Sequence, residues 1–134
     1  MSERENTELV QRTYGSFGDG DIPALLDSLY EDVQWVTAEV EGVPTGGTWR
    51  GREQVGQFFE TLSDVLEVRQ LELRGFVAKD DRVVALRHYA WHVKATGKVW
   101  ESDFANVLSV RDGKVTRFQE YTDTAALGDA FREG

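Results

Sequence analysis

The spacing of apolar residues changes near Glu67 from a helical period to a strand period, and this change limits the possible folds more than any other feature. Upstream, apolar side chains recur every three or four residues, which is typical of helices that bury one face. Downstream, apolar and polar residues alternate, as in strands that bury one face. Helices first and strands last predict an α+β fold with the helices packed on a curved, mostly antiparallel sheet.

Start and stop signals locate the individual elements. The predicted helices are Asn6 to Phe17, a second opened by Asp21 and Pro23, and Arg52 to Val65. The second helix is expected to bury Leu25, Leu26, Leu29 and Tyr30. A short strand is predicted at Asp32 to Thr37, and the glycine-rich segment Glu41 to Gly51 is predicted to be a loop. The long predicted strands are Leu71–Ala78, Val83–Lys94, Val99–Val110 and Val115–Thr122.

A final short turn, Thr124 to Phe131, is expected to be capped by Asp123. No internal repeat, low-complexity tract or linker interrupts the sequence. We therefore expect residues 1–134 to form a single domain.

Composition excludes several classes of function. The net charge of −9 gives a surface that repels phosphate backbones and anionic lipids, so neither nucleic acid nor membrane is an expected partner. The absence of cysteine removes disulfides, thiolate metal sites and cysteine nucleophiles. No apolar run approaches the roughly 18 residues of a membrane span, and the polar start from Met1 to Glu5 is unlike a signal peptide. These features predict a soluble, cytoplasmic protein.

The hairpin between the second and third long strands determines which side chains share a face, because opposed residues point to the same side. A two-residue turn at Thr96-Gly97 pairs positions whose numbers sum to 193. This register predicts an inner face carrying Arg87, Tyr89, Trp91, Val93, Trp100, Ser102, Phe104 and Asn106.

The last hairpin has two possible registers. A two-residue turn at Asp112-Gly113 would bring Arg117, Gln119 and Tyr121 to the inner face. A three-residue loop with Gly113 in the left-handed conformation would instead bring Phe118, Glu120 and Thr122 there. We favour the second, since Phe118 then joins Phe104 and Leu108 in one apolar layer.

The resulting inner face combines aromatic side chains with Arg87, Asn106 and Glu120, which is typical of a small-molecule site. The simpler interpretation is that the aromatic residues form ordinary core. Three polar groups that converge in an apolar layer need partners, however, because an unpaired buried charge costs several kcal/mol.

Several segments resemble the SnoaL-like branch of the NTF2-like superfamily, together with ketosteroid isomerase-related proteins. These segments are GDIPALL at 20–26, DVQW at 32–35, WRGREQV at 49–55, FANV at 104–107, VRDGKV at 110–115 and EYTDT at 120–124. The likeness covers nearly the whole chain and keeps the family's order. It implies a cone of α+β structure, with three helices in the concavity of the sheet, and a homodimer through the convex face. Members include ketosteroid isomerases, polyketide cyclases, limonene epoxide hydrolases and non-catalytic binding domains.

The resemblance can be carried over residue by residue. The Asp base of ketosteroid isomerases corresponds to Thr37, the protonated oxyanion-hole Asp corresponds to Asn106, and the Tyr of the first helix corresponds to Thr13, one place before Tyr14. Threonine cannot act as a general base, so the isomerase mechanism is not implied. Glu120 is the nearest equivalent of the acid/base carboxylate of the cyclases.

Together these observations predict a pocket for an apolar, oxygenated molecule such as a polyketide, terpene or steroid-like ring system. In a cofactor-free isomerase, cyclase or hydrolase, Glu120 would transfer protons, and Asn106 with Arg87 would stabilise oxyanion charge. The predicted pocket residues are Tyr14, Trp35, Thr37, Trp49, Phe59, Tyr89, Trp91, Phe104 and Phe118, with Trp49 either a lid or plain core. The alternative is a non-catalytic binding or dimeric interaction domain, in which Arg87 and Glu120 neutralise each other.

The only two histidines, His88 and His92, are separated by four residues on a predicted strand. At the rise of a strand their side chains lie about 13 Å apart and cannot share a metal ion, so no metal site is expected. Both lie on the outer face with Val84, Leu86 and Ala90, and Asp103 belongs there too. That face is too apolar for open solvent, which predicts a dimer interface.

Overall fold

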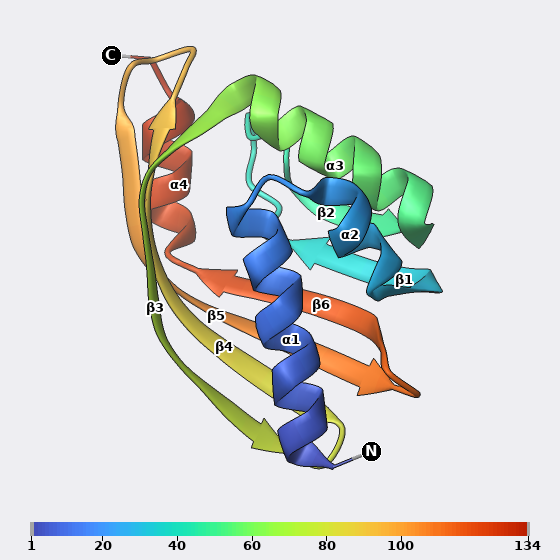
Figure 1. Cartoon of the computed structure of the whole chain (residues 1–134). Helices are drawn as coiled ribbons and strands as arrows, with labels where there is room; N and C mark the ends of the chain where they lie inside the picture. The colour runs from blue at the N-terminus through green and yellow to red at the C-terminus, as the bar shows by residue number, and fades with distance from the viewer. Residues whose placement is uncertain (1, 134) are drawn as a thin grey trace.

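A curved sheet forms one side of the molecule, and helices α1, α2 and α3 lie over its concave face (Figure 1). The computed structural model describes residues 2–133. The helices are α1 (Glu3–Gly18), α2 (Ile22–Asp27), α3 (Gly51–Val65) and α4 (Thr124–Phe131). The strands are β1 (Leu29–Thr37), β2 (Gly47–Arg50), β3 (Leu66–Lys79), β4 (Arg82–Val93), β5 (Val99–Arg111) and β6 (Lys114–Thr122). None of the helices in residues 2–133 is long and apolar enough to cross a membrane.

The sheet has the strand order β2-β1-β6-β5-β4-β3, with β1 and β6 parallel and every other pair antiparallel. The predicted α+β class with a curved, mostly antiparallel sheet is confirmed. The parallel contact brings the early strand β1 beside the last strand, so residues about 80 positions apart share one wall. Helix α4 closes the far end of the concave face, where it packs on β5 (Figure 1).

Polar side chains cap the N-termini of α1, α2 and α4, whereas α3 has no side-chain cap. Ser2 and Glu5 form a capping box at α1, and the side chains of Asp21 and Asp123 accept hydrogen bonds from the first turns of α2 and α4. The segment from Thr124, predicted to be a short turn, is a helix of eight residues, so residues 2–133 contain a fourth helix besides the three that the resemblance implied.

Several predicted element boundaries differ from the structure: α1 begins at Glu3 rather than Asn6, and β3 begins at Leu66 rather than Leu71. Helix α2 ends at Asp27, so Leu29 and Tyr30 begin β1, where Leu29 is buried and Tyr30 is exposed. The segment predicted to be a loop contains β2, which pairs with β1 through Trp35 opposite Trp49. Glycines lie at both ends of this short strand, so its alternation of polar and apolar residues could not be recognised in the sequence.

The register of the β4–β5 hairpin differs from the prediction by two residues. Trp91 pairs with Trp100 and Arg87 pairs with Phe104, so paired numbers sum to 191, and the strands are joined by the five residues from Lys94 to Lys98. Because side chains alternate with a period of two, a shift of two residues leaves each side chain on its predicted face.

The last hairpin has the favoured register, but its turn is not the predicted one. Its turn is the two-residue form, with both Asp112 and Gly113 at positive φ and Arg111 paired with Lys114. A bulge follows between Ser109 and Val110, and beyond it Leu108 pairs with Phe118 and Asn106 with Glu120. The prediction of a three-residue loop is therefore wrong, whereas Phe118, Glu120 and Thr122 do lie on the concave side.

Candidate functional site

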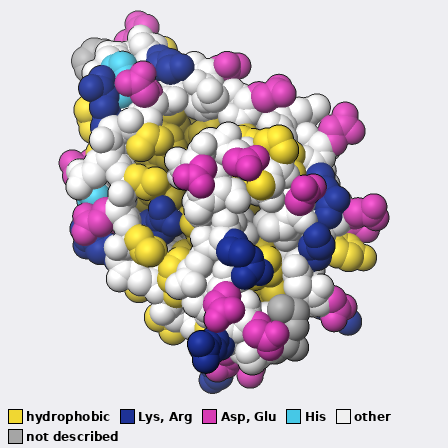
Figure 2. Space-filling model, in the orientation of Figure 1, with side chains coloured by type: hydrophobic (Ala, Val, Ile, Leu, Met, Phe, Trp, Pro, Cys, Tyr) yellow, Lys and Arg dark blue, Asp and Glu magenta, His cyan; other side chains and the backbone are white. Residues whose placement is uncertain are grey.

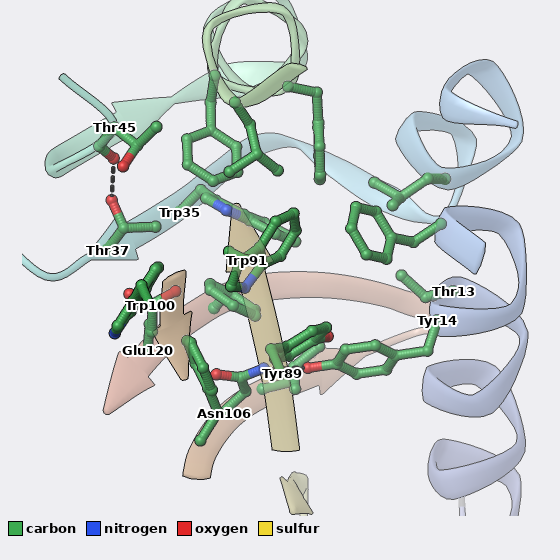
Figure 3. A pocket seen from close by; sticks show the side chains of 18 residues that line it. Thr13, Tyr14, Trp35, Thr37, Thr45, Tyr89, Trp91, Trp100, Asn106 and Glu120 are labelled. Atoms are coloured by element: carbon green, nitrogen blue, oxygen red, sulfur yellow. Dashed lines mark hydrogen bonds between the residues drawn. The ribbon is translucent and has the colours of Figure 1, made fainter. Parts of the chain in front are cut away.

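A cavity lies between the concave face of the sheet and the helices (Figure 3). Its volume, counted as the space open to the centres of water-sized spheres, is about 70 Å³. Its lining comes from α1, α2, α3, the loop before β2 and four strands: Thr13, Tyr14, Phe17, Leu25, Trp35, Thr37, Thr45, Phe58, Phe59, Leu62, Tyr89, Trp91, Trp100, Phe104, Asn106, Leu108, Phe118 and Glu120. All predicted site residues except Arg87 and Trp49 are in this set.

Aromatic rings form most of the wall. The parallel pairing of β1 with β6 places Trp35 beside Phe118, and their rings stack with centroids 3.9 Å apart and an interplanar angle of 6°. Tyr89 meets the ring of Phe104 edge-on at 4.8 Å. Offset and edge-to-face contacts of this kind hold rings in fixed orientations, so the wall is preorganised for a flat apolar ligand.

Glu120 supplies the one carboxyl group of the lining. It lies opposite Asn106 across the β5–β6 ladder, and its Oε1 accepts a hydrogen bond of 3.3 Å from the Ala38 backbone N–H at the end of β1. Burial raises the pKa of Glu120 to about 7, against the smaller lowering effect of that hydrogen bond. At neutral pH the carboxyl group is therefore divided between its protonated and ionised forms, as a general acid/base requires.

Tyr14 and Asn106 form a hydrogen-bonded pair from elements 92 residues apart in sequence. The Asn106 Nδ2 donates to the Tyr14 hydroxyl oxygen at 2.6 Å, and Tyr14 extends from α1 toward Asn106 (Figure 3). Burial raises the pKa of Tyr14 far above its ordinary value, so the hydroxyl keeps its proton. Because its oxygen already accepts from Asn106, the Tyr14 O–H is available to donate to a ligand.

The resemblance had placed Thr13 at the position of the helix-one Tyr, but the structure brings Tyr14 to Asn106 instead. Thr13 Oγ1 donates to the Leu9 carbonyl at 3.0 Å and lies 3.0 Å from Ser28 Oγ. These contacts anchor the side chain within α1 and to the end of α2. Thr13 thus supports the helix while its neighbour supplies the polar group of the site.

Thr37, at the position of the isomerase base, is also engaged by the backbone. Its Oγ1 donates to the Thr45 carbonyl at 2.5 Å, which ties β1 to the loop before β2 (Figure 3). Trp49 donates to the same carbonyl at 3.3 Å and packs edge-on against Phe58, so it stands behind the cavity wall rather than in it.

Arg87 is 5% exposed but does not line the cavity. Its guanidinium carbon lies 4.3 Å from the ring centroid of Tyr14 and 5.4 Å from that of Tyr89, which are cation–π contacts. Within residues 2–133 Arg87 forms no ion pair, and its Nε is buried without a hydrogen-bond partner. The alternative that Arg87 and Glu120 neutralise each other is therefore wrong, because aromatic faces stabilise this cation instead.

Several buried polar atoms of the lining have no hydrogen-bond partner within the described residues. They are the indole N–H groups of Trp35, Trp91 and Trp100, and the Oδ1 of Asn106. Buried donors without partners are costly, and native structures rarely retain several in one place. Three residues of the lining thus carry a buried indole donor that no described group satisfies.

On the convex face, His88 contacts two carboxylates of β5. Its Nδ1 lies 2.7 Å from Asp103 and its Nε2 lies 2.8 Å from Glu101. Hydrogen bonds that the carboxylates of Glu101 and Asp103 accept from the ring raise the pKa of His88, and the bond with His88 lowers the pKa of Asp103. Within residues 2–133 no group of His, Asp and Glu side chains is arranged to hold a metal ion.

Comparison with known proteins connects this geometry to a family. The sequence profile of the SnoaL-like domain matches residues 10–118. This chain belongs to the SnoaL-like domain family. The profile match covers the cavity from α1 to β6 and ends at Phe118, two residues before Glu120.

Relatives share the whole architecture. The chain is 31% identical to an NTF2-like protein from Burkholderia xenovorans LB400, with a TM-score of 0.89 over 98% of this chain and 99% of that one. It is also 31% identical to TerC, crystallised with polyporic acid, with a TM-score of 0.83 over 95% of this chain and 98% of TerC. An uncharacterized protein from Mycobacterium tuberculosis is 27% identical, covering 94% of this chain and 95% of the relative. The SnoaL-like, NTF2-like assignment is thus confirmed.

Some lining residues were not among the predicted pocket residues. Trp100 and Leu108 follow from the alternation of β5, and Phe58 and Leu62 follow from helical spacing around Phe59. Thr45 gave no such signal, since it lies in an irregular segment whose position depends on the pairing of β2 with β1.

Proposed function

We propose that this protein is a cofactor-free acid/base catalyst that transfers a proton on an apolar, oxygenated small molecule. The observation that carries the proposal is Glu120, whose pKa is raised to about 7 in a cavity that also holds the Tyr14–Asn106 donor pair. A base poised near the working pH and a fixed donor for developing oxyanion charge are the two components that proton transfer beside a carbonyl needs.

In this mechanism the ionised Glu120 takes a proton from carbon next to a carbonyl group of the ligand. The electron pair of the broken C–H bond moves toward the carbonyl oxygen, which becomes an enolate oxygen. The Tyr14 O–H donates to that oxygen, and the cation of Arg87, stacked on the Tyr14 ring, acts through the ring rather than by contact. The protonated Glu120 then returns the proton to another atom of the ligand.

The residues that line the cavity indicate the class of ligand. Stacked rings favour a flat apolar skeleton, and the indole donors of Trp35, Trp91 and Trp100 favour oxygen acceptors on it. The relative TerC was crystallised with polyporic acid, which supports a small organic molecule as the ligand of this site. A polyketide, terpene or steroid-like ring system fits this description.

A second candidate is ligand binding without catalysis. Thr37 favours it, because this residue occupies the position of the isomerase base and uses its hydroxyl to hold the Thr45 carbonyl. Binding alone would leave Glu120 as a hydrogen-bonding group for the ligand. The two candidates differ in whether proton transfer requires that carboxyl.

Deuterium exchange separates the two candidates. Small ring ketones such as cyclohexanone are incubated with the protein in D₂O, and exchange next to the carbonyl is followed by NMR. The wild-type rate should depend on a group with a pKa of about 7, and Glu120→Gln should lower it about 100-fold or more. The matched control is Glu39→Gln, which removes an exposed carboxylate one residue from the backbone donor of Glu120. Equal rates in Glu120→Gln and wild type would refute the catalytic proposal.

We further propose a homodimer through the convex face and a location in the cytoplasm. Across β4, β5 and β6 the outer row Leu86, Ala105 and Tyr121 is apolar, and Leu86 and Tyr121 are exposed. Burying such a row removes apolar area from water. Leu86→Asp should shift the sedimentation coefficient to that of a monomer, whereas Leu71→Asp on the other face of the sheet should not. A monomeric wild type would refute the dimer.

A further inference from the structure

A second hollow lies beside the cavity. It lies between the C-terminal end of α1, the start of α2, α3 and the edge strand β3, with a volume of about 410 Å³. We call it the β3 groove, and its lining is Phe17, Gly18, Gly20, Ile22, Phe59, Leu62, Ser63, Leu66, Val68, Leu71 and Trp91. Figure 2 shows hydrophobic side chains gathered in the hollow between the long strands and the helices.

Four residues belong to the lining of both the β3 groove and the cavity. Phe17, Phe59, Leu62 and Trp91 line both, so the two spaces are separated only by side chains. The ring centroids of Phe17 lie 5.9 Å from Phe59 and 6.4 Å from Trp91. The side chains of these four residues form the constriction between the two spaces.

The cavity alone is too small for the ligands that its chemistry suits. A water molecule needs at least about 10–15 Å³ of such volume, so about 70 Å³ accommodates roughly six non-hydrogen atoms, or one ring. A ligand with a larger skeleton must extend beyond the cavity. The β3 groove lies on the other side of the constriction and offers the space for that extension.

The groove is built for an apolar extension. Val68 and Leu71 are 43% and 37% exposed, although the pairing of β3 with β4 turns them to the concave side, opposite Trp91 and Tyr89. Helix α1 contributes Gly18 to the same wall, where an added Cβ would meet no atom within 4 Å. Apolar residues thus face an open channel that no other described segment fills.

We infer that the cavity and the β3 groove form one continuous site for an elongated ligand. Its compact oxygenated ring lies at Glu120 and Tyr14, and its apolar chain or further rings lie along Val68 and Leu71. The inference rests on the proposed function for the position of the polar head. It adds the substrate class, namely molecules with an apolar extension several carbons long on one side of an oxygenated ring.

A series of 4-alkylphenols tests the inference, because phenol matches the size of the cavity and the alkyl chain probes the groove. Dissociation constants of phenol and of its 4-ethyl, 4-butyl and 4-hexyl derivatives are measured by calorimetry. Each methylene that enters the groove should tighten binding roughly fourfold. The double variant Val68→Asp with Leu71→Asp should lose this dependence on chain length and bind phenol as the wild type does.

The control variant is Val77→Asp, which places the same charge on the opposite face of β3, at a position 58% exposed. It should keep the chain-length dependence. The inference would be overturned if the affinity of the wild type did not change with chain length. It would also be overturned if the groove variant showed the same dependence on chain length as the wild type, or if the wild type bound none of the phenols. The same series with Glu120→Gln should show the same chain-length dependence, so the groove can be tested even if Glu120 transfers no proton.

Discussion

The two faces of the central strands carry carboxyl groups whose pKa values are shifted in opposite directions. On the concave face, Glu120 is partly buried in a cavity lined by aromatic rings, and this burial raises its pKa to about 7. On the convex face, Asp103 is exposed beside His88, and the hydrogen bond between them lowers the pKa of Asp103. Glu120 and Asp103 belong to adjacent strands of the same sheet. The surroundings therefore decide whether a carboxyl group becomes an acid/base or a surface charge.

The same division applies to the cations. Arg87 on the concave face has no carboxylate partner in the described residues and rests on the rings of Tyr14 and Tyr89. Arg74 on β3 is exposed and lies 3.2 Å from Glu72 and 3.8 Å from Asp103. A site for chemistry keeps its charges few and desolvated, whereas the outer surface pairs them in water, where each pair contributes little.

The largest expected difference between the faces concerns packing. Leu108 on β5 is fully buried on the concave face, whereas Leu86 on β4 is 38% exposed on the convex face. Leu108→Ala should lower the free energy of unfolding by about 2–5 kcal/mol, and Leu86→Ala by about 1 kcal/mol or less. Urea denaturation at a protein concentration where any dimer is dissociated measures both. Equal losses would contradict the assignment of the core to one face.

The next difference concerns pH. The folded-state pKa of Glu120 is raised from 4.5 to about 7, so folding favours its protonated form, and stability falls as pH rises through that window. Relative to Glu120→Gln, the free energy of unfolding of the wild type should fall by up to about 3 kcal/mol between pH 5 and pH 8. Urea denaturation across this range measures the difference. A difference that does not change with pH would show that Glu120 is solvated, and Glu39→Gln serves as the control.

A smaller difference is expected from a matched pair of tyrosines. Tyr14→Phe removes the acceptor of the Asn106 amide in the buried site, whereas Tyr121→Phe removes a hydroxyl from an exposed ring. The first substitution should cost about 1–3 kcal/mol and the second less than about 0.5 kcal/mol, as measured by thermal unfolding. A cost below 0.5 kcal/mol for both would mean that the Tyr14–Asn106 bond is absent in solution.

The smallest effect belongs to the convex-face histidine. The carboxylates of Glu101 and Asp103 raise the pKa of His88 above 6.5, so any stability from this cluster is present below that value and is lost as pH rises through the folded pKa. NMR titration of His88 should give a pKa above that of a model peptide. The double variant Glu101→Gln with Asp103→Asn, or added salt, should lower it. An unchanged pKa in the double variant would remove the proposed cause.

Much of the site could be predicted because strand alternation is a local property. The odd positions of β4 pair with the even positions of β5 in both the predicted and the observed register, so a register error of two residues did not change the face of any side chain. The side of the sheet on which Tyr89, Phe104 and Asn106 lie was therefore predictable. Helical spacing in the same way identified Phe59 as an inward residue of α3.

Contacts between distant elements were not predictable in this way. The sequence could not distinguish Thr13 from Tyr14 as the neighbour of Asn106, because that choice depends on the rotation of α1 against a strand 92 residues away. It also could not predict that Arg87 would rest on aromatic rings away from Glu120, since a long side chain can extend in several directions from one backbone position.

The amino-acid sequence by itself determined the α+β class, the acidic and cysteine-free character, and which residues of β4 and β5 point inward, because the period of apolar residues and the composition are properties of the chain itself. Only the tertiary structure decided that a bulge after a two-residue turn brings Glu120 to the concave side, that β2 joins the sheet, and that the β3 groove lies beside the cavity. These features depend on distances between segments far apart in sequence, and such distances are set when all the elements pack together.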